Sequence, residues 1–366
     1  MDPHGPIAQR FPLVARFRPA CLPLPERIAS IAQLADAAAS ESDQGDASAV
    51  YNQAALVASD LGLPDLAREM CHQHAAAYLH ACPLPAMSAI RALEPAVNLA
   101  RLQVRAGRGD EGRRRLLALF EAVGTGTPVR FEDISIPADL TATAEDRKEV
   151  HAWLWRVLLA DGTRTLTTQG RWDEALAHIE QHHGIGSRML DGRQVTVLAA
   201  LTTGDTDRAR SLLDHTTPGD PWEQIVAACL AVLCNLAAGE STMQPVADLA
   251  NIYLAAPTGH GTTVFDIRLG LTILAAARST GQTITRALVD DLHRRTMEAG
   301  DGYAARETLT DTQFTELSSD RKKQQCRNLL RECALDSGDF PADLLSDLLS
   351  ATRTGDRVIR GSLLGT

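Results

Sequence analysis

The feature of this sequence that most constrains its fold is a glycine turn that recurs between amphipathic stretches. Glycine stands at positions 62, 107, 170, 204 and 239, and each is followed within three residues by an acidic or hydroxyl side chain. Weaker versions occur at positions 281 and 338. Glycine readily adopts the left-handed conformation that ends a helix, and Asp, Ser or Thr caps a following helix. The pattern predicts an all-α chain, with at least six antiparallel helix pairs between residues 46 and 353 and essentially no sheet outside residues 124–142.

The composition favours the same fold class. Hydrophobic residues make up 45% of the chain, which is enough for a sizeable core, but only 4% of residues are aromatic. The apolar residues are mainly Ala, Leu, Val and Ile. Ala and Leu are strong helix formers, and small Ala side chains let neighbouring helices approach closely. A β-sandwich would need more aromatic and β-branched residues.

The turns also carry a repeat signature. Successive turn glycines are 45, 63, 34, 35, 42 and 57 residues apart, and two of these spacings match a period of about 34 residues. The most specific turn reads Gly170-Arg171-Trp172-Asp173-Glu174-Ala175, and Gly62 and Gly204 are likewise followed by Ala five residues later. The sequence therefore resembles the tetratricopeptide repeat family, well over residues 46–255 and poorly over residues 256–353. The resemblance implies a right-handed α-solenoid of stacked antiparallel helix pairs.

Three regions are expected along the chain. Residues 1–45 form a Pro-rich segment, extended because six of the 17 prolines lie in residues 1–25, and a capping helix from about residue 26 to 40. We expect the extended segment to pack over the first helices. Residues 46–255 form the repeats, interrupted at about 124–142 by an insertion that is either an ordered loop or a short hairpin. Residues 256–366 form divergent repeats and a C-terminal cap. Trp172 is expected to fill a gap between adjacent repeats.

Charge and cysteine usage limit the classes of partner and compartment. The net charge is -10 and the basic runs are short, which argues against nucleic acid as a partner. No apolar run resembles a signal peptide or reaches the length of a membrane span. The seven cysteines include no Cys-x-x-Cys pair, so a reducing cytoplasm is expected. Only three basic residues are lysine, and this preference for arginine favours a GC-rich bacterial genome.

Candidate binding residues emerge when the sequence is aligned on the turn glycines. Two polar residues lie nine positions before their glycine, two arginines lie six before, and two amides lie ten before. In members of the family that clamp a carboxylate, groove residues near these positions supply charged and amide contacts, although Leu56 and Leu198 depart from that pattern. The alternative is that the same residues tie neighbouring helices together. The residues in question are Asn98 and Asp161, Arg101 and Arg164, and Asn52 and Gln194.

A second candidate is the glycine-containing stretch at residues 184–194. Its glycines precede a helix and could expose backbone N–H groups to an anion, with Arg188 and Arg193 beside them. A plain loop between repeats is the simpler interpretation of the stretch and is favoured over an anion site. No phosphate-binding loop, nucleophile elbow or dinucleotide fingerprint is present, and the histidine spacings do not complete a metal site. No cofactor and no metal are therefore expected.

These observations favour a binding scaffold over an enzyme. The expected partner is a peptide or protein, with an anionic group, held in a polar, Arg-containing concave groove. The alternative is an enzyme or enzyme accessory that uses a small-molecule pocket around Asp161, Arg164, Arg188 and Arg193. An open groove would favour the scaffold, and a closed, deep pocket would favour the enzyme.

Overall fold

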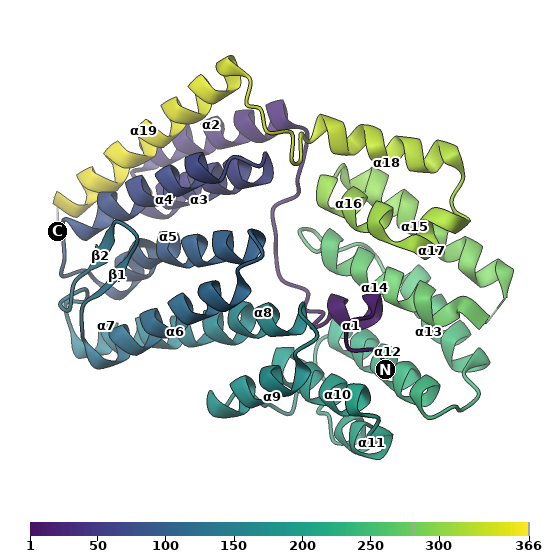
Figure 1. Ribbon diagram of the computed structural model, residues 1–366. Coiled ribbons are helices and arrows are strands. Elements are labelled where there is room, and N and C mark those ends of the chain that lie inside the picture. The colour runs from purple at the N-terminus through teal and green to yellow at the C-terminus, as the bar shows by residue number, and fades with distance from the viewer. Residues whose placement is uncertain (280, 365–366) are drawn as a thin grey trace. The chain divides into compact units, whose positions relative to one another are not determined.

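The computed structural model describes residues 1–279 and 281–364, which form helices joined by short turns (Figure 1). These residues pack into two compact units. Unit 1 comprises residues 1–23 and 166–333, and unit 2 comprises residues 24–165 and 334–366. The divisions differ from the boundaries expected at 45/46 and 255/256, because those were placed from local turn signals whereas packing joins segments distant in sequence. Residues 280, 365 and 366 of the expected third region lie outside the described residues.

Unit 2 contains the first helices, one hairpin and the last helix. Its elements are α2 (Leu24–Glu41), α3 (Gln44–Asp60), α4 (Pro64–Leu79), α5 (Ala86–Arg105), α6 (Gly109–Thr125), β1 (Val129–Phe131), β2 (Ile134–Ile136), α7 (Ala144–Val157), the π-helical turn η1 (Leu158–Gly162) and α19 (Ala342–Leu364). The short α8 (Thr163–Thr167) crosses the division between residues 165 and 166. The last helix packs against α2 and α3, so the expected C-terminal cap covers the first helices of this unit.

Unit 1 contains the N-terminal residues and the helices of the second half. Its elements are α1 (Pro6–Arg10), α9 (Trp172–Gln181), α10 (Asp191–Thr203), α11 (Thr206–Asp214), α12 (Pro221–Ala237), α13 (Met243–Ala255), α14 (Thr263–Ala276), the 3-10 turn η2 (Ala277–Ser279), α15 (Gln282–Ala299), α16 (Gly302–Thr310), α17 (Thr312–Leu317) and α18 (Asp320–Glu332). No helix among the described residues combines the length and apolar character needed to cross a bilayer.

Six helix pairs are present among the described residues, and five of them flank one of the predicted turn glycines. Between residues 46 and 353, the helices that pack as pairs are α3 with α4, α5 with α6, α10 with α11, α12 with α13, α14 with α15 and α16 with α18. The glycines at the five strong turns all have positive φ, for example 72° at Gly170 and 85° at Gly204. An L-residue with a side chain rarely adopts these angles, so glycine is what lets each helix end there. The prediction of an all-α solenoid of stacked helix pairs is confirmed.

The expectation about helix caps is mostly wrong. Among the five strong turns only Asp205 caps the next helix, by accepting a hydrogen bond from the backbone N–H of Arg208 at 3.0 Å. Asp65, Asp110 and Asp173 lie two positions after the N-cap residue, in the first turn of their helices. There they stabilise the positive end of the helix dipole, and Asp65 also accepts a hydrogen bond from Arg68 at 2.8 Å.

The core of unit 2 depends on small residues. Alanines on α3, α4 and α5 are almost fully buried, among them Ala54, Ala75 and Ala96. The closest approach occurs between α5 and α6, where a Cβ added at Gly112 would lie 2.7 Å from the carbonyl oxygen of Ala100. Because Gly112 has no side chain, the backbones of α5 and α6 approach closely at this point. Such close packing of helices is what the alanine-rich composition predicts.

The insertion at residues 124–142 folds as a hairpin, one of the two forms expected. Strands β1 and β2 pair antiparallel, with Val129 opposite Ile136 and Phe131 opposite Ile134. Three of these apolar side chains are buried, those of Phe131, Ile134 and Ile136. The chain then makes an isolated bridge with Leu84, whose N–H donates to Leu140 at 2.9 Å.

The N-terminal segment differs from its expected place. It contains the short helix α1 and then runs without helix or strand to Pro23. Residues 1–23 pack with the helices of unit 1 rather than over α2 and α3. Trp172, at the start of α9, is buried, as expected for a bulky residue at this position. Its indole N–H donates to the carbonyl oxygen of Pro3 at 3.2 Å. No local signal in residues 1–25 indicates a docking site so far along the chain.

Trp172→Ala should destabilise the protein by about 3 kcal/mol, because it removes a large buried side chain and leaves a cavity. Chemical denaturation of the variant and the parent protein measures the difference. An unchanged free energy of unfolding would show that the ring contributes no net burial.

Gly112→Ala should destabilise the protein by about 1–3 kcal/mol, because the new methyl group meets a backbone carbonyl that cannot rotate away. The matched control is Gly361→Ala in α19, where an added Cβ meets nothing within 4 Å. Removing a helical glycine there should be neutral or stabilise by up to about 1 kcal/mol. Urea unfolding of both variants tests the close approach, and equal stabilities would contradict it.

Candidate functional site

A continuous row of polar side chains joins α3, α5 and η1 in unit 2. Asn52 donates from its amide to Glu94 at 2.6 Å, Asn98 donates to Asn52 at 2.9 Å, and Arg101 donates to Asn98 at 3.1 Å. The Arg101 guanidinium also donates to Oδ2 of Asp161 from Nε at 2.9 Å and lies 2.8 Å from it through Nη2. We refer to Asn52, Glu94, Asn98, Arg101 and Asp161 as the polar ladder.

The helical period explains why these side chains meet. Glu94, Asn98 and Arg101 are spaced i, i+4, i+7, so they share one face of α5. Arg91 and Arg105 extend this polar face to both ends of the helix. Arg91 donates to the Gln44 side chain at 2.9 Å, and Arg105 lies 3.0 Å from Asp60. The seam between α3 and α5 is therefore polar along its whole length.

The inner end of the ladder is partly buried. Burial raises the pKa of Glu94 above its usual range, while hydrogen bonds from Asn52 and Ser48 and the charges of Arg91 and Arg101 act in the opposite direction. Ser48 also shares a 2.7 Å hydrogen bond with His74. Burial lowers the pKa of His74 to about 3, so this ring is neutral near pH 7. A buried carboxylate must be hydrogen-bonded to be tolerated, and the amide of Asn52 meets that need.

The outer end of the ladder is open. The side chain of Arg101 is 51% exposed and that of Asp161 is 25% exposed. Asp161 lies in η1, where a π-helical turn interrupts the long helix formed by α7 and α8. Such turns are rare within α-helices and are frequent at functional sites. Arg164, three residues further on, is half-buried on α8.

The remaining predicted residues lie in unit 1, and each has its own partners. Arg188 donates to Asp220 at 2.8 Å and to Glu223, at the start of α12. Arg193 donates to the carbonyl oxygen of Leu212 at 2.6 Å, at the end of α11. Gln194 is fully buried and binds the main chain of Leu13. The structure thus brings Asn52, Asn98, Arg101 and Asp161 together, and it places Arg188, Arg193 and Gln194 in the other unit.

The sequence analysis missed two groups of polar residues. Glu94, Arg91 and Arg105 are signalled by the polar stripe along residues 91–105, which the alignment on turn glycines passed over. Glu132 at the tip of the hairpin carried no such signal. It accepts a hydrogen bond from Arg115 at 2.8 Å and lies within 3.7 Å of Arg68, so it anchors the hairpin to α6 and α4.

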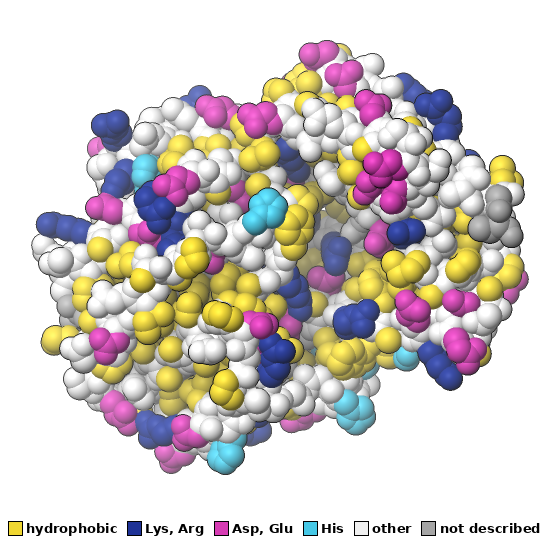
Figure 2. All heavy atoms as spheres, turned by 180° about the vertical axis from the view of Figure 1, so that it is seen from behind, with side chains coloured by type: hydrophobic (Ala, Val, Ile, Leu, Met, Phe, Trp, Pro, Cys, Tyr) yellow, Lys and Arg dark blue, Asp and Glu magenta, His cyan; other side chains and the backbone are white. Residues whose placement is uncertain are grey.

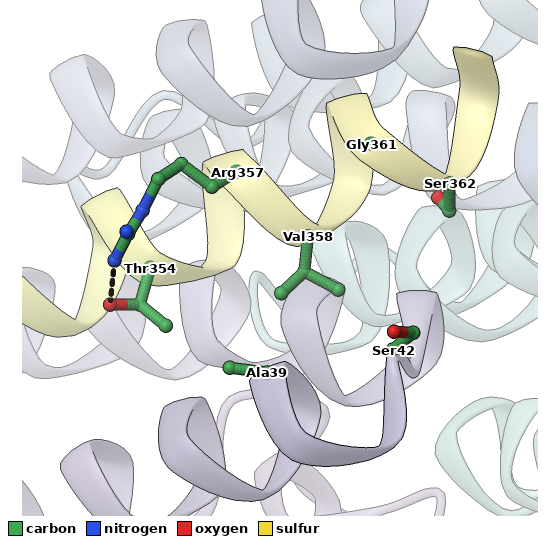
Figure 3. A pocket seen from close by; sticks show the side chains of 7 residues that line it. All are labelled: Ala39, Ser42, Thr354, Arg357, Val358, Gly361 and Ser362. Atoms are coloured by element: carbon green, nitrogen blue, oxygen red, sulfur yellow. Dashed lines mark hydrogen bonds between the residues drawn. The ribbon is translucent and has the colours of Figure 1, made fainter. Parts of the chain in front are cut away.

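A cavity of about 360 Å³ lies between the end of α2 and α19 (Figure 3). Small side chains such as Ala39 and Ser42 line it, together with Gly361 and Val358. Its one charged residue, Arg357, folds back and donates to Thr354 at 3.1 Å (Figure 3). None of the predicted site residues lines this cavity, and the residues that line it include no carboxylate, histidine or cysteine.

The surface charges and the side-chain clusters also bear on the kinds of ligand that this site suits. On the face shown in Figure 2, Lys and Arg alternate with Asp and Glu and form no continuous basic area. Residues 1–279 and 281–364 contain no group of three or more His, Cys, Asp or Glu side chains placed to hold a metal ion. The polar ladder is therefore suited to hydrogen bonding and to ion pairing.

A family model described as tetratricopeptide repeat matches residues 93–118 and 163–181. The first match contains the Gly107 turn and the outer residues of the ladder on α5, and the second contains Arg164 and the Gly170 turn. No curated protein and no solved structure matches the chain. Over these two stretches the chain is similar to tetratricopeptide repeats, in agreement with the resemblance that the turn glycines indicated.

Glu94→Gln should change how stability depends on pH. Because the fold raises the pKa of Glu94, the folded state binds more protons than the unfolded state, and stability falls as pH rises above the usual Glu range. A glutamine side chain does not titrate, so the variant does not lose stability in this way. It keeps an oxygen atom that accepts the hydrogen bond from Asn52. It should gain stability relative to the parent protein on going from pH 4 to pH 7.5. Urea unfolding at both pH values measures the difference, and parallel pH profiles would contradict the prediction.

Proposed function

We propose that unit 2 binds an extended peptide or protein tail whose carboxylate or phosphate group rests on Arg101. The observation that carries this proposal is the state of the Arg101 side chain, which is half exposed and yet held in place from two sides. Asn98 and Asp161 fix the guanidinium plane, so little side-chain entropy remains to be lost on binding. An arginine held in this way is a ready partner for an anion.

The hydrogen-bond inventory of Arg101 leaves room for a ligand. A guanidinium carries five N–H donors. Within the described residues, its Nε, one Nη1 and one Nη2 donor are directed to Asp161 and Asn98. Two donors therefore remain on an exposed edge, and a carboxylate or phosphate oxygen accepts such donors strongly.

The neighbouring residues support an extended ligand rather than a single ion. Asn52 and Asn98 continue from Arg101 along the seam, and amide side chains bind main-chain groups of any sequence. Arg164 follows Asp161 by three residues and adds a second cation to the same region. In this proposal the partner is a peptide or a protein, and it is neither nucleic acid nor a membrane. The proposed location is the cytoplasm.

Arg101→Ala and Arg164→Ala should each weaken binding of an acidic tail by about 1.5–3 kcal/mol, or roughly 10- to 150-fold, because a charge-assisted hydrogen bond is lost. Binding should also fall with rising salt, because part of the attraction is screened. The measurement is fluorescence anisotropy with the best-binding peptide from an array. Each array sequence is presented with a free terminal carboxylate, with a terminal amide and with phosphoserine.

Arg105→Ala is the matched control for this experiment. It removes an arginine from the same face of α5, one turn further on, where its partner is the buried Asp60. This variant should lose thermal stability and keep its peptide affinity. Arg101→Ala should show the opposite pattern, because an exposed ion pair contributes at most about 1 kcal/mol to folding. Native affinity in folded Arg101→Ala and Arg164→Ala proteins would refute the proposal.

A further inference from the structure

Unit 1 holds an extended segment of its own chain by the main chain. The amide of Gln194 accepts from the N–H of Leu13 at 2.7 Å and donates to its carbonyl oxygen at 2.7 Å. Eight residues later, the N–H of Cys21 donates to Asp301 at 3.0 Å and its carbonyl oxygen accepts from the N–H of Gly302 at 2.8 Å. These contacts recognise an extended backbone whatever its side chains are.

The side chain of Gln194 is held in place to bind the main chain of this segment. Its side chain is fully buried on α10, where an amide without partners would be costly. Both ends of the amide are directed to a single residue of the segment, and Nε2 also donates to the carbonyl oxygen of Met189 at 3.0 Å. Gln194 stands ten residues before a turn glycine, the position at which the sequence predicted a ligand contact in the groove. The ligand seen there is the chain itself.

The side-chain contacts select arginine. Arg10 pairs with Asp311 at 2.5 Å, and Arg16 pairs with Asp191 at 2.6 Å. The guanidinium of Arg18 lies 3.7 Å from the ring centre of Tyr303, a cation–π contact. These partners come from α10, from α16 and from the start of α17, so acidic and aromatic groups follow the segment over its length.

Apolar pockets add a second requirement. Between Arg10 and Arg16 the side chains of Phe11 and Leu13 are almost fully buried, whereas Phe17 is 67% exposed. The segment is therefore buried continuously from Arg10 to Leu13 and again at Cys21, and it is more exposed between these two points. Its prolines at positions 12, 19 and 23 restrict the unbound chain toward extended forms and lower the entropy lost on docking.

The contacts of the segment satisfy its polar groups less completely than a protein core does. Among the described residues, Nη1 of Arg10 is buried without a hydrogen-bond acceptor. From Phe11 to Pro23 the segment has no helix or strand of its own, so its attachment depends on a few side chains and pockets. Segments with few regular backbone hydrogen bonds detach locally more easily than packed helices.

We infer that unit 1 is a receptor for an extended, arginine-containing peptide, and that residues 10–21 are its tethered resident ligand, which exchanges with a partner segment of the same chemistry. The groove is defined by Gln194, Asp191, Asp301, Tyr303 and Asp311. The partner segment carries an apolar residue for the pocket of Leu13 and arginines on either side of it. This inference concerns unit 1 and does not rest on the proposed function of unit 2.

Native-state hydrogen exchange on the full chain tests whether the segment detaches. The N–H groups of Leu13, Arg18 and Cys21, each hydrogen-bonded within unit 1, should exchange at least about tenfold faster than the protected amides of α10 and α14. Protection equal to that of the two helices, with the same dependence on urea, would mean that the segment leaves only on global unfolding. That result would overturn the inference without any variant.

Peptide exchange tests the receptor. In the full chain, Leu13→Pro removes the N–H group that donates to Gln194 and should therefore loosen the tethered segment. A fluorescent peptide of residues 1–23 should bind this variant at least about tenfold more tightly than it binds the parent protein, whose tethered copy competes at high effective concentration. Adding Gln194→Ala should abolish binding, and so should placing Leu13→Pro in the peptide.

Gln9→Ala provides the matched control, because Gln9 is exposed on α1 beside the contacts described. In the chain it should leave peptide binding at the parent level, and in the peptide it should leave affinity for the Leu13→Pro protein unchanged. A folded Leu13→Pro protein that binds no peptide would overturn the inference. Equal affinity of the peptide for the parent protein and the variant would do the same. If the variant does not fold, the exchange rates of the parent protein decide the question.

Discussion

A helix pair cannot bury its apolar face by itself, and this constraint shapes both units of the protein. Each pair must be covered by the next, so the first and last pairs of any stack are left with an open side. In unit 2 the side offered by α2 and α3 is covered by α19, which arrives from the far end of the sequence. In unit 1 the N-terminal residues place Phe11 and Leu13 among the helices. In each unit, a segment distant in sequence thus adds apolar contacts to the helices of the repeats.

The parts of this fold that could be predicted from sequence are those encoded locally. Gly170 and Gly204 mark helix ends because the backbone angle there is a property of the residue itself. Arg101 and Asp161 could be placed together because each has a fixed distance in residues from its own turn, and the structure joins them by hydrogen bonds. The contact between Leu13 and Gln194 spans 181 residues, and nothing in either neighbourhood indicates the other. Glu132 was missed for a similar reason, since a carboxylate in a hairpin turn gives no sign of the arginines on α4 and α6 that surround it.

The polar seam between α3 and α5 shows how burial and binding capacity are connected. Glu94 is tolerated in the seam because Asn52 donates to it, and Asn52 then offers its own oxygen to Asn98. Asn98 in turn orients Arg101. Because each group is hydrogen-bonded to the next, the orientation of the exposed guanidinium depends on the partly buried carboxylate of Glu94, two helix turns away. A hydrogen-bonded chain of this kind fixes the orientation of its last member better than a single surface ion pair does.

The two proposals assign opposite charge preferences to the two units. The groove of unit 1 offers carboxylates and an aromatic ring, and it holds arginines. The ladder of unit 2 ends in a guanidinium, and Arg164 stands near it in the sequence. An acidic tail suited to Arg101 would meet Asp191 and Asp311 in unit 1, where like charges brought together would oppose binding. Specificity is a difference of affinities, and repulsion from the wrong site contributes to it as much as attraction to the right one. The chain can therefore keep its own basic segment in one unit without that segment competing with an acidic partner for the other.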